Sequence, residues 1–246
     1  MDISFELVAR DDEAVTKQLA FIESHLPFVN IINVPDLLRF PIRSWEVSRR
    51  VNREKYRFIP HFRAIDFDIK STRLFDIIDE FALQEVLLVT GDPPPDMSYK
   101  VYDTRVLDLI EKTRERFPEL KIYGGFDSYR SSVREEVQYM HDKLEAGADA
   151  LFSQPFFDMR FLEIYGEHIS GDKVYWGISP VIKEQSRRYW ETMNNVVFPT
   201  AYHASYEWNT DFANQVLSYA ARTGGSVYFM PIRIDLEKYF AGIKIR

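Results

Sequence analysis

The chain has 246 residues, 46% of them hydrophobic, which allows one large α/β domain or two small ones with a substantial core. A formal net charge of −7 argues against a protein that binds the phosphate backbone of nucleic acids, because such a protein needs a basic surface. Cysteine is absent, which excludes disulfides, thiolate zinc sites and cysteine nucleophiles. The five histidines are scattered without the spacing of a metal motif, and we expect no metal site.

Targeting signals are not evident. The N-terminal segment MDISFELVARDDEAV has neither the basic start nor the apolar stretch of a signal peptide. No apolar run reaches the length of about 18 residues that a membrane-spanning helix needs. We therefore expect a soluble protein of the cytoplasm.

Short runs rich in β-forming residues recur along the whole chain and alternate with helical patterns. Eight runs are predicted strands, at residues 3–7, 28–34, 58–65, 85–91, 120–126, 148–156, 173–181 and 225–232. Apolar residues at helical spacing predict helices between them, for example from Val15 to Ile22, from Leu74 to Phe81 and from Val106 to Ile110.

The clearest helix is predicted after the fifth strand. Ser132 and Glu135 have the spacing of a capping box, in which each side chain accepts a hydrogen bond from a free backbone N–H. An apolar stripe from Val133 to Leu144 follows, and Gly147 supplies the stop. A longer segment, residues 199–224, separates the last two strands. It predicts a loop and a helix over 212–221, as an insertion at the mouth of a barrel.

Eight repeats of strand and helix, with mostly continuous apolar strands, are the pattern of a parallel sheet covered by helices. Eight units favour a closed (β/α)8 TIM barrel. No linker or low-complexity block interrupts the chain, so we expect a single domain over residues 1–246. The alternative is an open, doubly wound sheet, but no GxGxxG motif follows any predicted strand.

Polar residues collect where the predicted strands end, which is where barrel enzymes carry their catalytic groups. They are Glu6, His61, Asp92, Asp127, Gln154 and Ser179. Glu6 either faces out of the first strand or lies in the mouth, where burial would raise its pKa and make it a general acid. His61 is either a core imidazole bonded to backbone or a site residue. Asp92 is either a turn residue or a site carboxylate.

Gln154 stands directly before Pro155 in an otherwise apolar run. A buried amide there needs partners for its donors and its acceptor, and a planar heteroaromatic ligand would supply them. The basic stretch over residues 43–57 is either a solvated helix face or a contact for an anionic tail. Aromatic residues near strand ends either pack in the core or stack on a flat ligand; they are Phe126, Phe156, Phe157 and Phe229.

Six segments, in this order along the chain, resemble successive strand motifs of the methylenetetrahydrofolate reductase family: ISFEL, IPHFRAID, LLVTGDPP, DKLEAGADALFSQPFFD, YWGISPVI and GSVYFMPIRIDLEKYF. The resemblance implies a (β/α)8 barrel that reduces the methylene bridge of a folate to a methyl group. It also implies FAD in the mouth of the barrel and NAD(P)H as the hydride donor, in one-carbon metabolism and methionine biosynthesis.

By position, the resemblance makes Glu6 the general acid and Asp92 the carboxylate between flavin and folate. Gln154 is similar to the glutamine that bonds the pterin, and we add Phe126 to the substrate site. The resemblance implies flavin contacts for His61 and Lys143, and we expect Asn33 and Asp127 in the same cofactor site.

The flavin-side segments depart from the family. The Thr-Tyr-Gly-Ala segment after the second strand is replaced by Asn33, Val34 and Pro35. The family's Arg before Gly-Asp is Thr90, and its Tyr-Pro-Glu reads as residues 126–128, Phe-Asp-Ser.

Our first hypothesis is therefore a reductase of 5,10-methylenetetrahydrofolate or a related one-carbon pterin. The alternative is a folate-dependent, corrinoid-linked methyltransferase or a non-catalytic pterin-binding component. Zinc-thiolate methyl transfer is disfavoured because the chain has no cysteine. A homo-oligomer or a partner subunit is compatible with either hypothesis.

Overall fold

The structure, a computed structural model, describes residues 1–94 and 99–245. Parallel strands close into a barrel in chain order, and the first strand pairs with the eighth. The strands are β1 (Ile3–Glu6), β2 (Ile31–Val34), β3 (Arg57–Arg63), β4 (Glu85–Val89), β5 (Lys121–Phe126), β6 (Ala150–Pro155), β7 (Val174–Ile178) and β8 (Ser226–Phe229). The predicted TIM barrel is confirmed.

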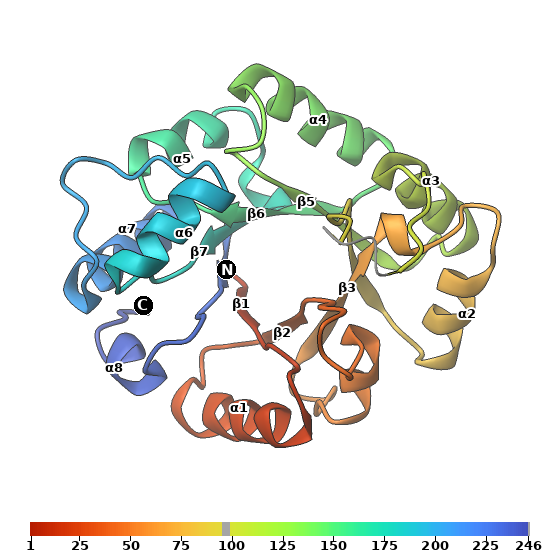
Figure 1. The fold of residues 1–246 in the computed structure, drawn as a ribbon, viewed down its shortest axis with the longest axis horizontal. Coiled ribbons are helices and arrows are strands. Elements are labelled where there is room, and N and C mark those ends of the chain that lie inside the picture. Colours follow the sequence, from red (N-terminus) through yellow and green to blue (C-terminus); the bar gives the residue numbers. More distant parts are fainter. Residues whose placement is uncertain (95–98, 246) are drawn as a thin grey trace.

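Helices form a ring around the strands (Figure 1). They are α1 (Asp12–His25), α2 (Arg73–Glu80), α3 (Val106–Arg116), α4 (Val133–Glu145), α5 (Met159–Gly166), α6 (Glu184–Met193), α7 (Tyr206–Thr223) and α8 (Leu236–Phe240). Short 3₁₀ helices occur as η1 (Ser44–Arg49), η2 (Ala64–Asp66) and η3 (Gly171–Lys173). No helix within residues 1–94 and 99–245 is both long and apolar enough to cross a lipid bilayer.

Helix α4 begins as its sequence predicts. The Ser132 hydroxyl accepts from the Glu135 N–H at 3.3 Å, and the Glu135 carboxylate accepts from the Ser132 N–H at 3.1 Å. Gly147 follows the helix with φ of +112°, a backbone conformation that residues other than glycine rarely adopt.

The strands alternate between two apolar layers. One set of side chains fills the inside of the barrel, including Ile31, Leu87, Phe152 and Tyr228. The other set points outward and packs under the helices in a larger core. Which layer a residue belongs to therefore decides whether it can reach the mouth.

The structure corrects two sequence predictions about the outer elements. Residues 43–57 form the short helix η1 followed by turns, and Trp45 and Val47 are buried, so this stretch is no continuous solvated helix face. The helix expected over 212–221 begins earlier, at Tyr206, because the Ser205 hydroxyl caps it. Helix α7 lies outside β7 and β8 in the ring (Figure 1). The additional elements between β7 and α7 are helix α6 and the loop that follows α6 in the chain.

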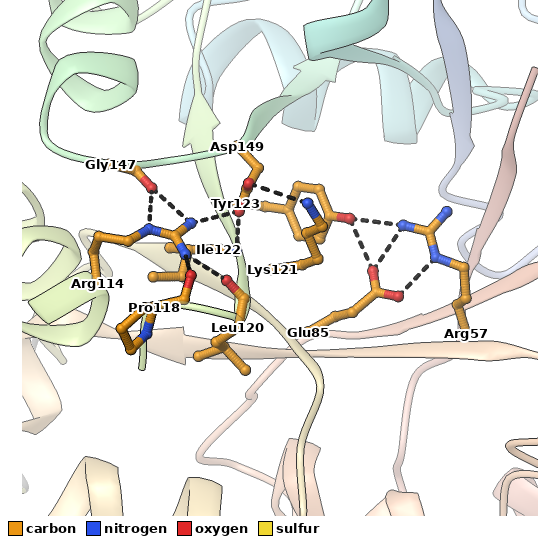
Figure 2. Close-up of polar contacts among 10 residues, drawn as sticks. All are labelled: Arg57, Glu85, Arg114, Pro118, Leu120, Lys121, Ile122, Tyr123, Gly147 and Asp149. Atoms are coloured by element: carbon orange, nitrogen blue, oxygen red, sulfur yellow. Dashed lines mark hydrogen bonds and ion pairs between the residues drawn. The ribbon is translucent and has the colours of Figure 1, made fainter. Parts of the chain in front are cut away.

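A polar layer closes the end of the barrel where the strands begin. Arg57 donates to both carboxylate oxygens of Glu85, at 2.7 and 2.8 Å, and to the Tyr123 hydroxyl at 2.7 Å (Figure 2). The Tyr175 hydroxyl donates to Asp2 at 2.9 Å, and Asp2 also pairs with Arg57. These contacts tie the starts of five strands to one another.

A second arginine in Figure 2 lies at the same end but outside the barrel. Arg114 of α3 donates to the Gly147 carbonyl at 3.0 and 3.1 Å and to the Asp149 carboxylate at 2.6 Å. The same carboxylate accepts from the Ile122 N–H at 2.8 Å. Arg114 thereby joins α3, the end of α4 and the starts of β5 and β6.

Candidate active site

The carboxyl ends of β8, β1, β2 and β3 bring four polar side chains together on the inner wall of the barrel. Glu6 and Asn33 are register partners across β1 and β2. The Tyr228 hydroxyl of β8 donates to Glu6 Oε2 on one side. On the other side, His61 Nε2 of β3 contacts Asn33 Oδ1. The result is a continuous polar arc over four neighbouring strands.

Glu6 is the titratable group of this arc near neutral pH. Burial raises its pKa to about 7, and the hydrogen bond from Tyr228 acts in the opposite direction. A carboxyl group with this pKa is substantially protonated at pH 7 and can also release its proton. These are the properties of a general acid.

His61 and Asn33 form the uncharged half of the arc. Burial lowers the pKa of His61 to about 3, so the imidazole is neutral at physiological pH. Its Nε2 lies against Asn33 Oδ1, an acceptor, and therefore carries the ring proton. Asn33 Nδ2 is buried and has no hydrogen-bond partner within the described part of the chain. It is a donor available to an uncharged ligand.

Gln154 lies at a β-bulge. The register between β6 and β7 shifts between Phe152 and Pro155, and the Ser153 hydroxyl accepts the Gly177 N–H at 2.7 Å. The bulge exposes the Gln154 side chain, so the expectation of a buried amide is wrong. The proline is tolerated because the ladder is already interrupted at this point.

Two aspartates follow β4 and β5. Asp92 is exposed, and its backbone carbonyl accepts from Arg63 Nη2 at 2.7 Å. Asp127 is half-buried and accepts from the Tyr129 N–H at 3.0 Å. Burial raises the pKa of Asp127, with a further contribution from the nearby carboxylates of Glu136 and Asp92. Because they follow the last residues of β4 and β5, both aspartates lie at the carboxyl end of the barrel.

The structure does not bring Phe126 and Lys143 into this group. Phe126 points outward and packs against Phe156, Tyr165 and Trp176 beneath the helices. Lys143 of α4 reaches the strands from the helix side, where its Nζ donates to the Gly125 carbonyl at 2.7 Å. Neither side chain faces the mouth from these positions.

Sequence reasoning missed two features of the mouth. The first is Tyr228 of β8, which points into the barrel like Met230, two positions further along the chain and just beyond the end of the strand. The second is a cluster at the rim, where Arg43 pairs with Asp36 and lies 3.9 Å from Asp66, and Arg63 lies 3.5 Å from Asp66. Burial raises the pKa of Asp36 to about 6, against the effect of Arg43. No sequence motif predicts this cluster, because its members come from the end of β3 and from the segments that follow β2 and β3.

Solved structures share the fold. An uncharacterized protein from Clostridium thermocellum that binds two copies of 5-methyl-5,6,7,8-tetrahydrofolic acid matches with a TM-score of 0.67 and 11% identity, over 98% of this chain and 93% of that one. Active domain 2 of a chitinase from Pyrococcus furiosus, known from catalytic site mutants, matches with a TM-score of 0.53 and 11% identity, over 93% of this chain and 83% of that one. At such identities the likeness concerns the fold alone.

Sequence comparison is more specific. No curated protein matches the chain. The family model described as "Methylenetetrahydrofolate reductase" matches residues 46–223, which is more than half of the chain. The chain therefore belongs to the methylenetetrahydrofolate reductase family.

Proposed function

We propose that this protein reduces 5,10-methylenetetrahydrofolate, or a related one-carbon pterin, to its 5-methyl form, with NAD(P)H as the hydride source. The observation that carries the proposal is Glu6, a carboxyl group with a pKa of about 7 inside the mouth of a barrel of this family. Its position on the inner wall, beside Asn33 and Tyr228, gives a bound pterin a proton donor.

Glu6 gives its proton to the bridging nitrogen of the five-membered ring. The bond between this nitrogen and the methylene carbon breaks, and its electron pair stays on the nitrogen. The protonated nitrogen is N10; the other ring nitrogen, N5, shares its lone pair with the methylene carbon and holds it as a cationic iminium. A hydride from the dihydronicotinamide adds to this carbon, which is reduced to methyl while the nicotinamide is oxidised. Glu6, left as a carboxylate, recovers its proton from water.

Two further side chains have roles in this proposal. Asp92 places a carboxylate at the mouth, where it stabilises the cationic iminium. The exposed amide of Gln154 bonds the donors and acceptors of the pterin edge, which lines up on the bulge of β6. Both residues lie at the carboxyl end of the barrel, where TIM barrels carry their active sites.

The family implies FAD as the carrier of the hydride, and the residues predicted to hold it fit only in part. Asn33 Nδ2 is a buried donor without a described partner and suits an uncharged ring. His61 is neutral and already bonded to Asn33, and Lys143, the predicted cation, faces the helix layer. This set does not fit the diphosphate of FAD. We therefore derive no step through a flavin.

A second candidate is a pterin-binding component without reductase activity. The uncharacterized Clostridium thermocellum protein with the same fold binds 5-methyl-5,6,7,8-tetrahydrofolic acid. In this candidate, the mouth of the barrel in this chain would hold a methyl-folate, for example to present it to a corrinoid protein. The two candidates differ in whether Glu6 transfers a proton.

The deciding experiment is an anaerobic assay of the purified protein with methylenetetrahydrofolate and either NADH or NADPH, with and without added FAD. We expect 5-methyl product, and we expect Glu6→Gln to lower the turnover number about a hundredfold while the folate still binds. The visible absorption spectrum, recorded in the same samples, reports whether a flavin is bound and bleached.

No product under any of these conditions, together with tight folate binding, would exclude the reductase and favour the binding component. Near-normal turnover of Glu6→Gln would remove Glu6 from the role of acid. Both results are read against folate affinity measured by calorimetry, so that a misfolded variant is not mistaken for an inactive one.

A further inference from the structure

Tyr228 is held rigidly inside the barrel. Its ring meets Phe152 edge-on, with centroids 5.2 Å apart and planes at 84°. Phe152 in turn stacks on Tyr175 at 4.1 Å, with planes only 4° apart. All three side chains are buried. The ring of Tyr228 therefore has little freedom to turn, and the position of its hydroxyl is fixed by the packing below it.

The hydroxyl meets one oxygen of Glu6 and leaves the other free. Tyr228 donates to Glu6 Oε2, and the described residues offer Oε1 no hydrogen bond. Burial, followed by the charge of Glu6, raises the pKa of Tyr228 well above its ordinary value. The phenol therefore keeps its proton throughout the physiological range, and it donates whether Glu6 is charged or neutral.

We propose that Tyr228 is the positioning residue of Glu6: it fixes the carboxyl group and determines that the transferable proton sits on Oε1. In the neutral acid, the oxygen that accepts from Tyr228 is the carbonyl oxygen. The acidic proton is then left to the other oxygen, the one without a protein partner. The catalytic meaning of this arrangement rests on the proposed function, but the arrangement itself does not.

The surroundings of Glu6 make Tyr228 the group that adjusts its acidity. Asn33 faces Glu6 from β2 and does not titrate. His61, beyond it on β3, is neutral because burial lowers its pKa to about 3. The pKa of Glu6 thus reflects burial, which raises it, against the bond from Tyr228, which lowers it. Removal of the hydroxyl leaves only the raising effect.

The test is Tyr228→Phe, which removes the hydroxyl and keeps the ring. The titration of the Glu6 carboxyl is followed by ¹³C NMR, and its signal is assigned by its loss in Glu6→Gln. We expect the midpoint to move to higher pH. In the reductase assay, we expect turnover to fall about tenfold, the scale of one hydrogen bond to a charged group, and the alkaline limb of its pH profile to move upward.

The matched control is Tyr175→Phe, which also removes one buried hydroxyl from the barrel, at the opposite end, where it bonds Asp2. It should leave the Glu6 midpoint unchanged. A second measurement uses the unaltered protein: the ¹³Cζ signal of Tyr228 should shift at the same midpoint as the Glu6 carboxyl.

An unchanged Glu6 midpoint in folded Tyr228→Phe, or a Tyr228 signal that does not follow Glu6 in the unaltered protein, would overturn the proposal. Both readouts need no turnover. If the protein proves inactive as a reductase while both NMR results are as expected, the proposed function fails and the positioning of Glu6 by Tyr228 stands.

Discussion

Glu6 is placed where chemistry and stability oppose each other. Its pKa is raised from 4.5 to about 7 in the folded protein because burial disfavours the charged form. Between these two pH values the folded state binds more protons than the unfolded state. The free energy of unfolding therefore falls as the pH rises through this window, and the loss is complete above pH 7.

The first prediction follows from the direction of this pH dependence of the free energy of unfolding. Glu6→Gln removes the charge and keeps an acceptor for Tyr228, so the variant should be more stable than the parent at pH 8, by on the order of 1 kcal/mol after allowance for partial exposure. At pH 4 the gain should vanish, since Glu6 is neutral in both states there. Urea unfolding at the two pH values measures the difference. A gain that does not depend on pH would show that the stabilisation comes from packing and not from the charge.

Residue identity alone did not reveal which side chains meet. Glu6 and Tyr228 are 222 positions apart and touch because β1 and β8 close the barrel with Ser4 beside Tyr228. Phe126 was predicted for the substrate, but Tyr123 lines the barrel three positions earlier, so the alternation of β5 sends Phe126 outward. The types of side chain at the strand ends were predictable from the sequence, whereas their partners required the register of the closed sheet.

At the scale of elements, the bulge between β6 and β7 explains what periodicity could not predict. Gln154 falls in an apolar run, and a regular strand would bury it; the extra residue in β6 breaks the alternation and exposes it. By contrast, the capping box of α4 is local, so the sequence predicted its start correctly. The stretch over 43–57 has a weaker local signal, in which the Glu46 carboxylate accepts from the Arg43 N–H at 2.7 Å, and its short helix also depends on the burial of Trp45 and Val47.

The bulge depends on Gly177, and this gives the second prediction. A Cβ at this position would lie 2.5 Å from the Ser153 carbonyl oxygen and 2.9 Å from that of Gln154. Both are backbone atoms, so Gly177→Ala should push β6 and β7 apart and lower the free energy of unfolding by about 2 kcal/mol. It should also weaken folate binding, because the segment that aims Gln154 moves. Urea unfolding and calorimetry measure the two effects.

Gly125→Ala is the matched control on β5, the strand on the other side of β6. Its Cβ would meet a methyl group of Val89 at 3.1 Å, a side-chain tip that can move by a few tenths of an ångström. We expect a smaller loss of stability there. Equal losses in the two variants would mean that the barrel as a whole, and not the bulge, resists an added methyl group.

At the scale of the whole molecule, the two ends of the barrel carry different kinds of polar residue. At the mouth, the side chains of Glu6 and Gln154 have few hydrogen-bond partners among the described residues, and Asn33 Nδ2 has none. Such groups are able to form hydrogen bonds with a ligand. At the opposite end, Arg57 and Glu85 bond each other twice and share Tyr123 (Figure 2). This division follows the rule for TIM barrels, in which one end binds ligands and the other stabilises the fold.

The third prediction tests this division. Arg57→Met leaves the nearly buried Glu85 without its cation, so the free energy of unfolding should fall by about 2 kcal/mol, less than for a fully buried pair because Arg57 is partly exposed. Folate affinity and the Glu6 titration should not change, since both belong to the other end. The double variant Arg57→Met, Glu85→Leu should recover part of the loss, because it removes the unpaired carboxylate. A change of folate affinity in Arg57→Met would show that the polar layer and the mouth are coupled through the strands, and the two ends could then not be treated as independent.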